Sequence, residues 1–180
     1  MNNYLFCEQE HDLLRKSVRE FAEKEIKPIA QELDEKAEFS VELTKKMGDL
    51  GLFGVFVPEE YGGQEMDYLS YIIAVEELAR VDSSQAATIA AHNSLGIGPL
   101  LQFGTEEQKN MYLSKLATGE LRTGVGLTEP DAGTDLQGIQ TKAVLEGDHY
   151  IVNGSKMWIT NGRFANPLPV LVKTDTSAQP

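Results

Sequence analysis

Cysteine and long hydrophobic runs are scarce in this sequence. Cys7 is the only cysteine among 180 residues, so no disulfide can form within the chain, as is typical of proteins from reducing compartments. The longest apolar runs, such as residues 52–57, are far too short to cross a bilayer. The first residues carry neither a secretory signal nor a basic amphipathic transit segment. These absences predict a cytoplasmic protein.

Basic residues are also few, which argues against two classes of partner. Lysine and arginine number 16 against 28 acidic residues, and the formal net charge is -12. Such a surface repels phosphate backbones and anionic lipids. The sequence therefore predicts a protein that binds neither nucleic acid nor membranes.

No metal-ligand pattern is present either. The three histidines, His11, His92 and His149, are scattered, with no cysteine or glutamate at ligand spacing. The three carboxylates of residues 129–135 lie close together, but not at the spacing of a calcium loop. We interpret these carboxylates as helix caps and solvent contacts, and the histidines as ordinary structural residues.

Apolar residues at helical spacing dominate the chain up to about residue 120. The amphipathic pattern of residues 8–33 predicts a helix that Pro28 bends or interrupts, because proline has no N–H to donate. Four later helices are predicted after the N-cap residues Ser40, Asp67, Asp82 and Thr105, the last in a capping box with Gln108. The third of these, residues 85–103, is rich in small residues. Five helices with short connections predict a helical bundle.

After Arg122 the sequence changes to strand and turn patterns. Residues 140–145 and 149–152 predict two strands joined by a turn at Gly147, and residues 156–159 and 168–173 predict two more. The last of these must be an edge or irregular strand, because prolines stand at its start. The predicted fold is α+β, with an all-α bundle over residues 1–120 and the first part of an antiparallel β-barrel-like domain over residues 121–180.

Two stretches hold most of the chemically suggestive residues. Residues 128–135 place hydroxyls and glycine in a loop whose backbone N–H groups could hold a phosphate or a heteroaromatic edge, although an ordinary polar turn is an equal alternative. The second stretch is residues 156–162. Strand alternation would place its Trp158 and Thr160 on one side, where they suit a flat ring with polar edges. A core tryptophan is the more common arrangement. Gly124 and Gly126 begin a dinucleotide fingerprint that fails, because Glu129 replaces its third glycine.

These stretches resemble two signatures of the acyl-CoA dehydrogenases. Residues 126–135 read GLTEPDAGTD, and residues 148–162 read DHYIVNGSKMWITNG. The segments PEEYGG at 58–63, NSLG at 93–96 and FGTEEQK at 103–109 are similar to the same family. The resemblance covers essentially the whole chain and is strongest to the short-chain or butyryl type.

The resemblance implies FAD as cofactor and assigns residues to it. The implied cofactor-binding residues are Val125, Leu127, Thr128, Gly133, Thr134, Trp158, Ile159 and Thr160. Among them, Leu127 and Thr128 would meet the pyrimidine end of the flavin, and Thr134 would also touch the CoA part of the substrate. Trp158 would pack beside the isoalloxazine, and Thr160 would bond near N5. The small-residue helix would border the acyl tail.

The resemblance also implies an activity and partners. Members of the family oxidise an acyl-CoA, here a short one, to 2-enoyl-CoA, pass electrons to an electron-transferring flavoprotein, and form homo-oligomers. They continue beyond the segment matched here into a helical bundle that supplies the catalytic glutamate. We therefore expect this chain to be an N-terminal portion without a catalytic residue of its own. The alternative is a non-catalytic module that binds a partner chain through an open sheet edge.

Overall fold

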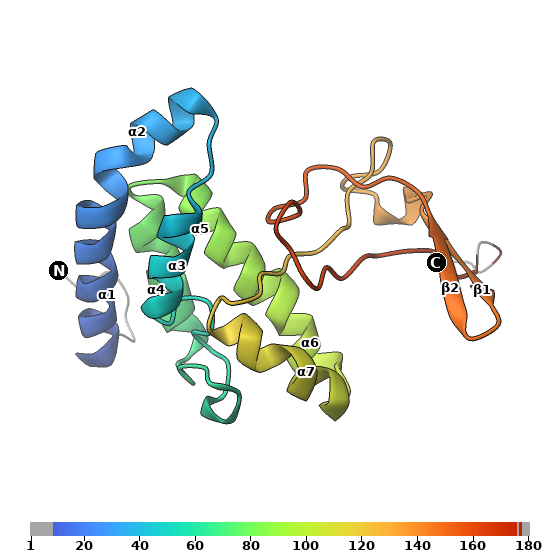
Figure 1. The fold of residues 1–180 in the computed structure, drawn as a ribbon, viewed down its shortest axis with the longest axis horizontal. Coiled ribbons are helices and arrows are strands. Elements are labelled where there is room, and N and C mark those ends of the chain that lie inside the picture. The colour runs from blue at the N-terminus through green and yellow to red at the C-terminus, as the bar shows by residue number, and fades with distance from the viewer. Residues whose placement is uncertain (1–8, 176, 178–180) are drawn as a thin grey trace.

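A computed structural model describes residues 9–175 and residue 177, so Cys7 lies outside the described part. Figure 1 shows two parts side by side, a group of helices and a more open region of turns. A hairpin lies at the outer edge of this second part. This arrangement confirms the predicted α+β class. It also places the chemically suggestive stretches next to the helices.

The helical part contains more breaks than the sequence pattern predicts. In chain order it comprises α1 (Gln9–Phe21), the π-helical turn η1 (Ala22–Ile26), α2 (Lys27–Lys36), α3 (Val41–Asp49), the 3₁₀ turn η2 (Glu59–Tyr61), α4 (Tyr68–Ala79), α5 (Ser83–Ala90), the π-helical turn η3 (Ala91–Ile97), α6 (Gly98–Phe103) and α7 (Glu106–Ala117). Each of the two longest predicted helices is divided by a π-helical turn. Pro28 lies in the first turn of α2, where its missing N–H is tolerated.

The predicted N-caps are confirmed. The side chains of Ser40, Asp67 and Asp82 each accept a hydrogen bond from a backbone N–H in the first turn of α3, α4 and α5. Thr105 and Gln108 form the reciprocal capping box of α7. These local signals fix where four helices begin.

The main core lies where α1, η1, α3, α4 and α5 meet. Its fully buried side chains include Ile26, Met47, Phe53, Leu78 and Ile89. A second cluster of buried residues lies under η3 and α7 and includes Val57, Ile97, Leu113 and Leu116. The small-residue helix contributes Ala86 and Ile89 to the first cluster and Ile97 to the second, so it packs into both.

A buried carboxylate joins α1 to α4. Glu77 is fully buried and accepts hydrogen bonds from Arg15, Arg19 and Arg80 at 2.7–2.9 Å. Burial alone would raise the pKa of Glu77, but the hydrogen bonds from Arg19, Arg80 and Arg15 lower it to about 2. The carboxylate is therefore ionised and serves the structure rather than chemistry.

The sheet is smaller than predicted. Strands β1 (Lys142–Glu146) and β2 (His149–Asn153) form an antiparallel hairpin with Val144 opposite Ile151, and Gly147 provides the positive φ of 66° in its turn. The strand predictions for residues 156–159 and 168–173 are wrong. Trp158 has a left-handed φ of 60°, which extended backbone cannot adopt.

The region of residues 168–173 forms only isolated bridges. Gly126 bridges to Val170, and Lys142 bridges to Lys173, both in the parallel sense. Pro167 and Pro169 have no N–H to continue a ladder, which explains the irregular path and agrees with the predicted effect of the prolines. A 3₁₀ turn, η4 (Leu136–Gly138), follows the 128–135 loop.

Candidate functional site

The structure brings the two suggestive stretches together. The backbone N–H of Met157 donates to the carbonyl oxygen of Thr128 at 2.9 Å, and Lys156 Nζ donates to the carbonyl oxygen of Leu127 at 2.9 Å. Gly124 packs against the end of the second stretch, because a Cβ there would lie 2.5 Å from the carbonyl oxygen of Thr160. Two segments about thirty residues apart in sequence therefore form adjacent walls of one surface, as the sequence interpretation required.

Glu129 is buried and links the two stretches that form this surface. Only 4% of its side chain is exposed, and its carboxylate accepts hydrogen bonds from Lys156 Nζ at 2.7 Å, from the Thr141 N–H at 3.0 Å and from the Gln140 N–H. Burial alone would raise the pKa of Glu129, but these hydrogen bonds, with Lys156 foremost, lower it to about 2. The prediction that this carboxylate is a cap or solvent contact is wrong. Glu129 is a buried ion-pair partner that ties the two stretches together.

The predicted cofactor-binding residues differ in their exposure. The half-buried ones are Val125, Leu127, Thr128 and Ile159, and the exposed ones are Gly133, Thr134, Trp158 and Thr160. The indole of Trp158 is 83% exposed, which excludes the alternative of a core tryptophan. Residue 158 is not in a strand, so the prediction that strand alternation sets the directions of Trp158 and Thr160 is also wrong.

The exposed surface suits a planar ligand with polar edges. A bare indole provides a flat apolar face, and the hydroxyl-bearing residues Thr128, Thr134 and Thr160 come from the same two stretches. A Cβ built on Gly133 would meet nothing within 4 Å, so that part of the loop is open to an approaching group. The residues present therefore fit the isoalloxazine of a flavin. Among residues 9–175 and 177, no cluster of metal-ligating side chains occurs.

The second stretch is held against the helices by Asn161. Its side-chain Nδ2 donates to the carbonyl oxygens of Thr88, in α5, and Thr123, at 3.1 and 3.0 Å. A cavity of about 410 Å³ opens beside this contact. Its lining comes from Phe39, from α5 and from residues 159–164. The candidate site thus reaches from the second stretch to α5, the start of the small-residue helix.

His92, in the small-residue helix, joins the helices to the start of the first stretch. It is fully buried, and its Nδ1 accepts a hydrogen bond from the N–H of Thr123 at 3.1 Å. Its Nε2 lies 3.0 Å from the carbonyl oxygen of Leu116. The interpretation of His92 as a structural residue is consistent with these contacts.

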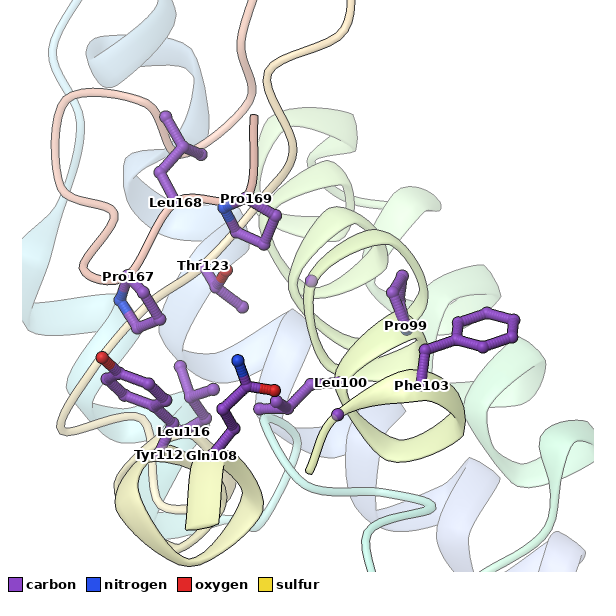
Figure 2. Close-up of a pocket in the computed structure, with 12 residues that line it drawn as sticks. Pro99, Leu100, Phe103, Gln108, Tyr112, Leu116, Thr123, Pro167, Leu168 and Pro169 are labelled. Carbon is purple, nitrogen blue, oxygen red and sulfur yellow. The ribbon is translucent and has the colours of Figure 1, made fainter. Parts of the chain in front are cut away.

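A second, apolar cavity of about 350 Å³ lies near residues 167–169 (Figure 2). Gly96, Pro99 and Leu100 line it from the small-residue helix, and Tyr112 and Leu116 from α7. Figure 2 shows Pro167, Pro169 and Thr123 on the side opposite Pro99. This cavity gives the small residues of η3 and α6 a surface that an apolar group can reach.

Three residues of the site were missed or undervalued by sequence reasoning. They are Lys156, Asn161 and Arg122, whose guanidinium lies 4.7 Å from the ring centroid of Phe164. Asn161 precedes a glycine, and this dipeptide is a turn signal that argues for a left-handed residue rather than a continuing strand. Lys156 and Arg122 carried no such signal, since their partners lie far away in sequence.

Comparison with known proteins identifies the class. Residues 8–120 match the N-terminal domain of acyl-CoA dehydrogenases, and residues 124–180 match the middle domain. The chain belongs to the acyl-CoA dehydrogenase family.

Individual relatives are similar to the chain over part of their own length. A short-chain-specific acyl-CoA dehydrogenase of Clostridium acetobutylicum is 52% identical over 167 residues, which are 93% of this chain and 44% of the relative. The structure of butyryl-CoA dehydrogenase from Megasphaera elsdenii superposes with a TM-score of 0.91 at 41% identity, covering 98% of this chain and 47% of that one. An acyl-CoA dehydrogenase of Bacillus anthracis complexed with FAD superposes with a TM-score of 0.87 at 42% identity, covering 93% and 29%.

The chain thus spans less than half the length of these relatives. Within the described residues, no helix is both long and apolar enough to traverse a bilayer.

Proposed function

We propose that this chain forms the first two walls of the FAD site of an acyl-CoA dehydrogenase that converts a short acyl-CoA to its 2-enoyl-CoA. One observation carries the proposal. The hydrogen bond between Met157 and Thr128 sets the two signature stretches side by side, with the indole of Trp158 bare beside them. Family membership and an FAD-complexed relative support the choice of cofactor.

The proposed roles follow from position and chemistry. Leu127 and Thr128 would meet the pyrimidine end of the flavin, and the hydroxyl of Thr128 can bond a polar ring edge. Trp158 would stack beside the ring system, and Thr160 would donate near N5. When bound, FAD would accept the hydride that leaves the substrate, while the protein orients both partners.

The other predicted cofactor-binding residues would make contacts around those of Leu127, Thr128, Trp158 and Thr160. Val125, Gly133 and Ile159 would complete the cofactor contacts, and Thr134 would touch both FAD and the CoA portion of the substrate. The 128–135 loop contains no cationic side chain that could meet a phosphate, and the nearby Lys156 is already paired with Glu129. Backbone N–H groups and hydroxyls would therefore make the polar contacts.

We further propose that the small-residue helix borders the acyl tail. Gly96, Pro99 and Leu100 leave an apolar cavity of about 350 Å³ at its C-terminal end, which supports this role. An electron-transferring flavoprotein would then take the electrons from the whole enzyme, which we expect to be a homo-oligomer. The division into a helical domain up to residue 120 and a β domain after it is part of this proposal.

Trp158 provides the test, because it is the only tryptophan of the chain. FAD titrated into the purified chain should quench Trp158 fluorescence saturably. The flavin should nevertheless be lost on gel filtration, since the two walls hold it only weakly. Thr160→Val should weaken the quenching, and Thr174→Val, at an exposed threonine outside both stretches, should not. Quenching that rises without saturation, equally in both variants, would contradict the proposal.

A second candidate function rests on the hairpin. Val144, Leu145, Tyr150 and Val152 are all exposed, so apolar side chains face outward on both sides of β1 and β2. A non-catalytic module could bind a partner chain there. A colourless, stable oligomer that does not respond to FAD would favour this function over the flavin site.

A further inference from the structure

The segment of residues 158–164 keeps its shape with little help from a core. Trp158 and Asn161 both adopt left-handed backbone, with φ of 60° and 65°, and neither is a glycine. Such conformations are rare for ordinary residues and persist only where the surroundings impose them. Trp158, Thr160 and Gly162 are exposed, so burial of these residues does not provide that constraint, and the half-buried Phe164 packs on Phe39 only at the far end of the segment.

Polar contacts of Asn161 provide it instead. Its backbone carbonyl accepts from the N–H groups of Phe164 and Ala165, both at 2.8 Å, which closes the turn that follows. Its side-chain Nδ2 donates to the carbonyl oxygens of Thr88 and Thr123 at 3.1 and 3.0 Å. One residue thus makes four hydrogen bonds and links its own turn to α5 and to the first stretch.

The chemistry of these contacts is specific to the amide. Both partners of Nδ2 are carbonyl oxygens, so the side chain must donate twice, and the carboxamide NH₂ has two protons to give. Asparagine is also among the few residues that tolerate left-handed backbone. Aspartate has a similar shape but offers no donor when ionised, and its charge would face two carbonyl oxygens.

We infer that Asn161 is a positioning residue that fixes the Trp158–Thr160 wall against the helical part of the molecule. In this role it acts through the position of the wall, by way of its hydrogen bonds to Thr88 and Thr123. It acts by holding the Thr160 carbonyl over Gly124 and the indole of Trp158 in its exposed orientation. This inference rests on the proposed function for its purpose, but its structural content can be measured without any flavin.

Hydrogen exchange of the purified chain tests the structural part. Asn161→Asp and Asn161→Gly both remove the two side-chain donors, while glycine retains the left-handed backbone. Both variants should exchange at least ten-fold faster over residues 158–164, and the anisotropy of Trp158 fluorescence should fall. Asn153→Asp, which introduces the same charge at an exposed position, should change neither. Wild-type exchange over residues 158–164 in both Asn161 variants, or acceleration equally large in α1 and α4, would overturn the inference.

FAD titration then separates the two proposals. If Asn161 positions the wall, the FAD concentration at half-maximal quenching should rise at least ten-fold in both Asn161 variants and stay unchanged in Asn153→Asp. Unchanged FAD quenching in a variant whose segment exchanges faster would also overturn the positioning role. Absence of saturable quenching in the wild-type chain would overturn the flavin site, while the exchange result would still decide whether Asn161 fixes the segment.

Discussion

His92 illustrates how a single buried side chain can fix its own protonation state. The amide N–H of Thr123 can only donate and the carbonyl oxygen of Leu116 can only accept. The imidazole must therefore be neutral, with its proton on Nε2. Burial, as the largest cause, lowers the pKa of His92 to about 4. Protonation would turn Nδ1 into a donor that faces another donor.

This geometry predicts how stability depends on pH. The pKa of His92 is about 6.5 in the unfolded chain and about 4 in the fold, so the unfolded state binds the proton first. Above pH 6.5 neutral His92 makes its full contribution to the free energy of unfolding. As the pH falls toward 4 this contribution is lost, up to about 3 kcal/mol. Urea unfolding followed by circular dichroism between pH 7 and pH 4 measures the loss.

The matched variant is His92→Gln, which does not titrate. Its free energy of unfolding should fall less steeply between pH 6.5 and pH 4.5 than that of the wild type. Glu77 and Glu129 do not obscure this window, because their pKa values of about 2 place their loss of stability below pH 4.5. An identical pH slope in the two proteins would show that His92 is not the titrating group.

At the scale of the element, helix starts were predictable because they are local. The caps at Ser40, Asp67 and Asp82 depend on a side chain and a backbone N–H only two or three residues away, which the sequence displays directly. The π-helical turn η3 was not predictable in this way. Its residues His92 and Asn93 bond to backbone groups tens of residues away, and such partners are set by tertiary packing.

The same distinction explains the failed strand of residues 156–159. Its residues have strand propensity, but Asn161 bonds to Thr88 and Thr123, which are 73 and 38 residues away in sequence. These contacts, together with the left-handed Trp158, replace the extended conformation. The site was therefore predictable as two stretches with the right residue types. Its internal links, Lys156 to Glu129 and Asn161 to the helices, were not.

The capping box of α7 gives a prediction at this scale. The Thr105 hydroxyl accepts from the Gln108 N–H at 3.2 Å, and the Gln108 side chain accepts from the Thr105 N–H at 2.9 Å. Thr105→Ala should lower the free energy of unfolding by about 1 kcal/mol. Ser114→Ala, at an exposed position within the same helix, should not lower it. Urea denaturation of the two variants measures the difference, and equal stability would mean that the box contributes nothing.

At the scale of the whole molecule, we propose that the described residues supply no catalytic base, and the carboxylates of the 128–135 loop support this. Abstracting a proton next to a thioester needs a carboxylate whose pKa lies near the working pH. Glu129 is buried, ion-paired and ionised, with a pKa of about 2. Asp135 accepts from the N–H of Gln137 as the cap of η4 and is exposed with Asp131 on the loop. None of the three is placed as a catalytic base.

We therefore expect no dehydrogenase activity from a purified polypeptide of these 180 residues. Butyryl-CoA, added FAD and an artificial electron acceptor provide the assay, with a full-length short-chain acyl-CoA dehydrogenase as the positive control. The rate should not exceed that of free FAD with the acceptor. Turnover above that rate would mean that a base exists among these residues.

The exposed hairpin has a consequence for how copies of the chain meet in solution. Its apolar side chains attract one another at contact, whereas the net charge of -12 repels copies at longer range. Salt shortens the repulsion to about 10 Å at 0.1 M and leaves the contact attraction intact. We therefore expect the chain to behave as a charge-stabilised colloid, in which ionic strength sets how readily two hairpins reach each other.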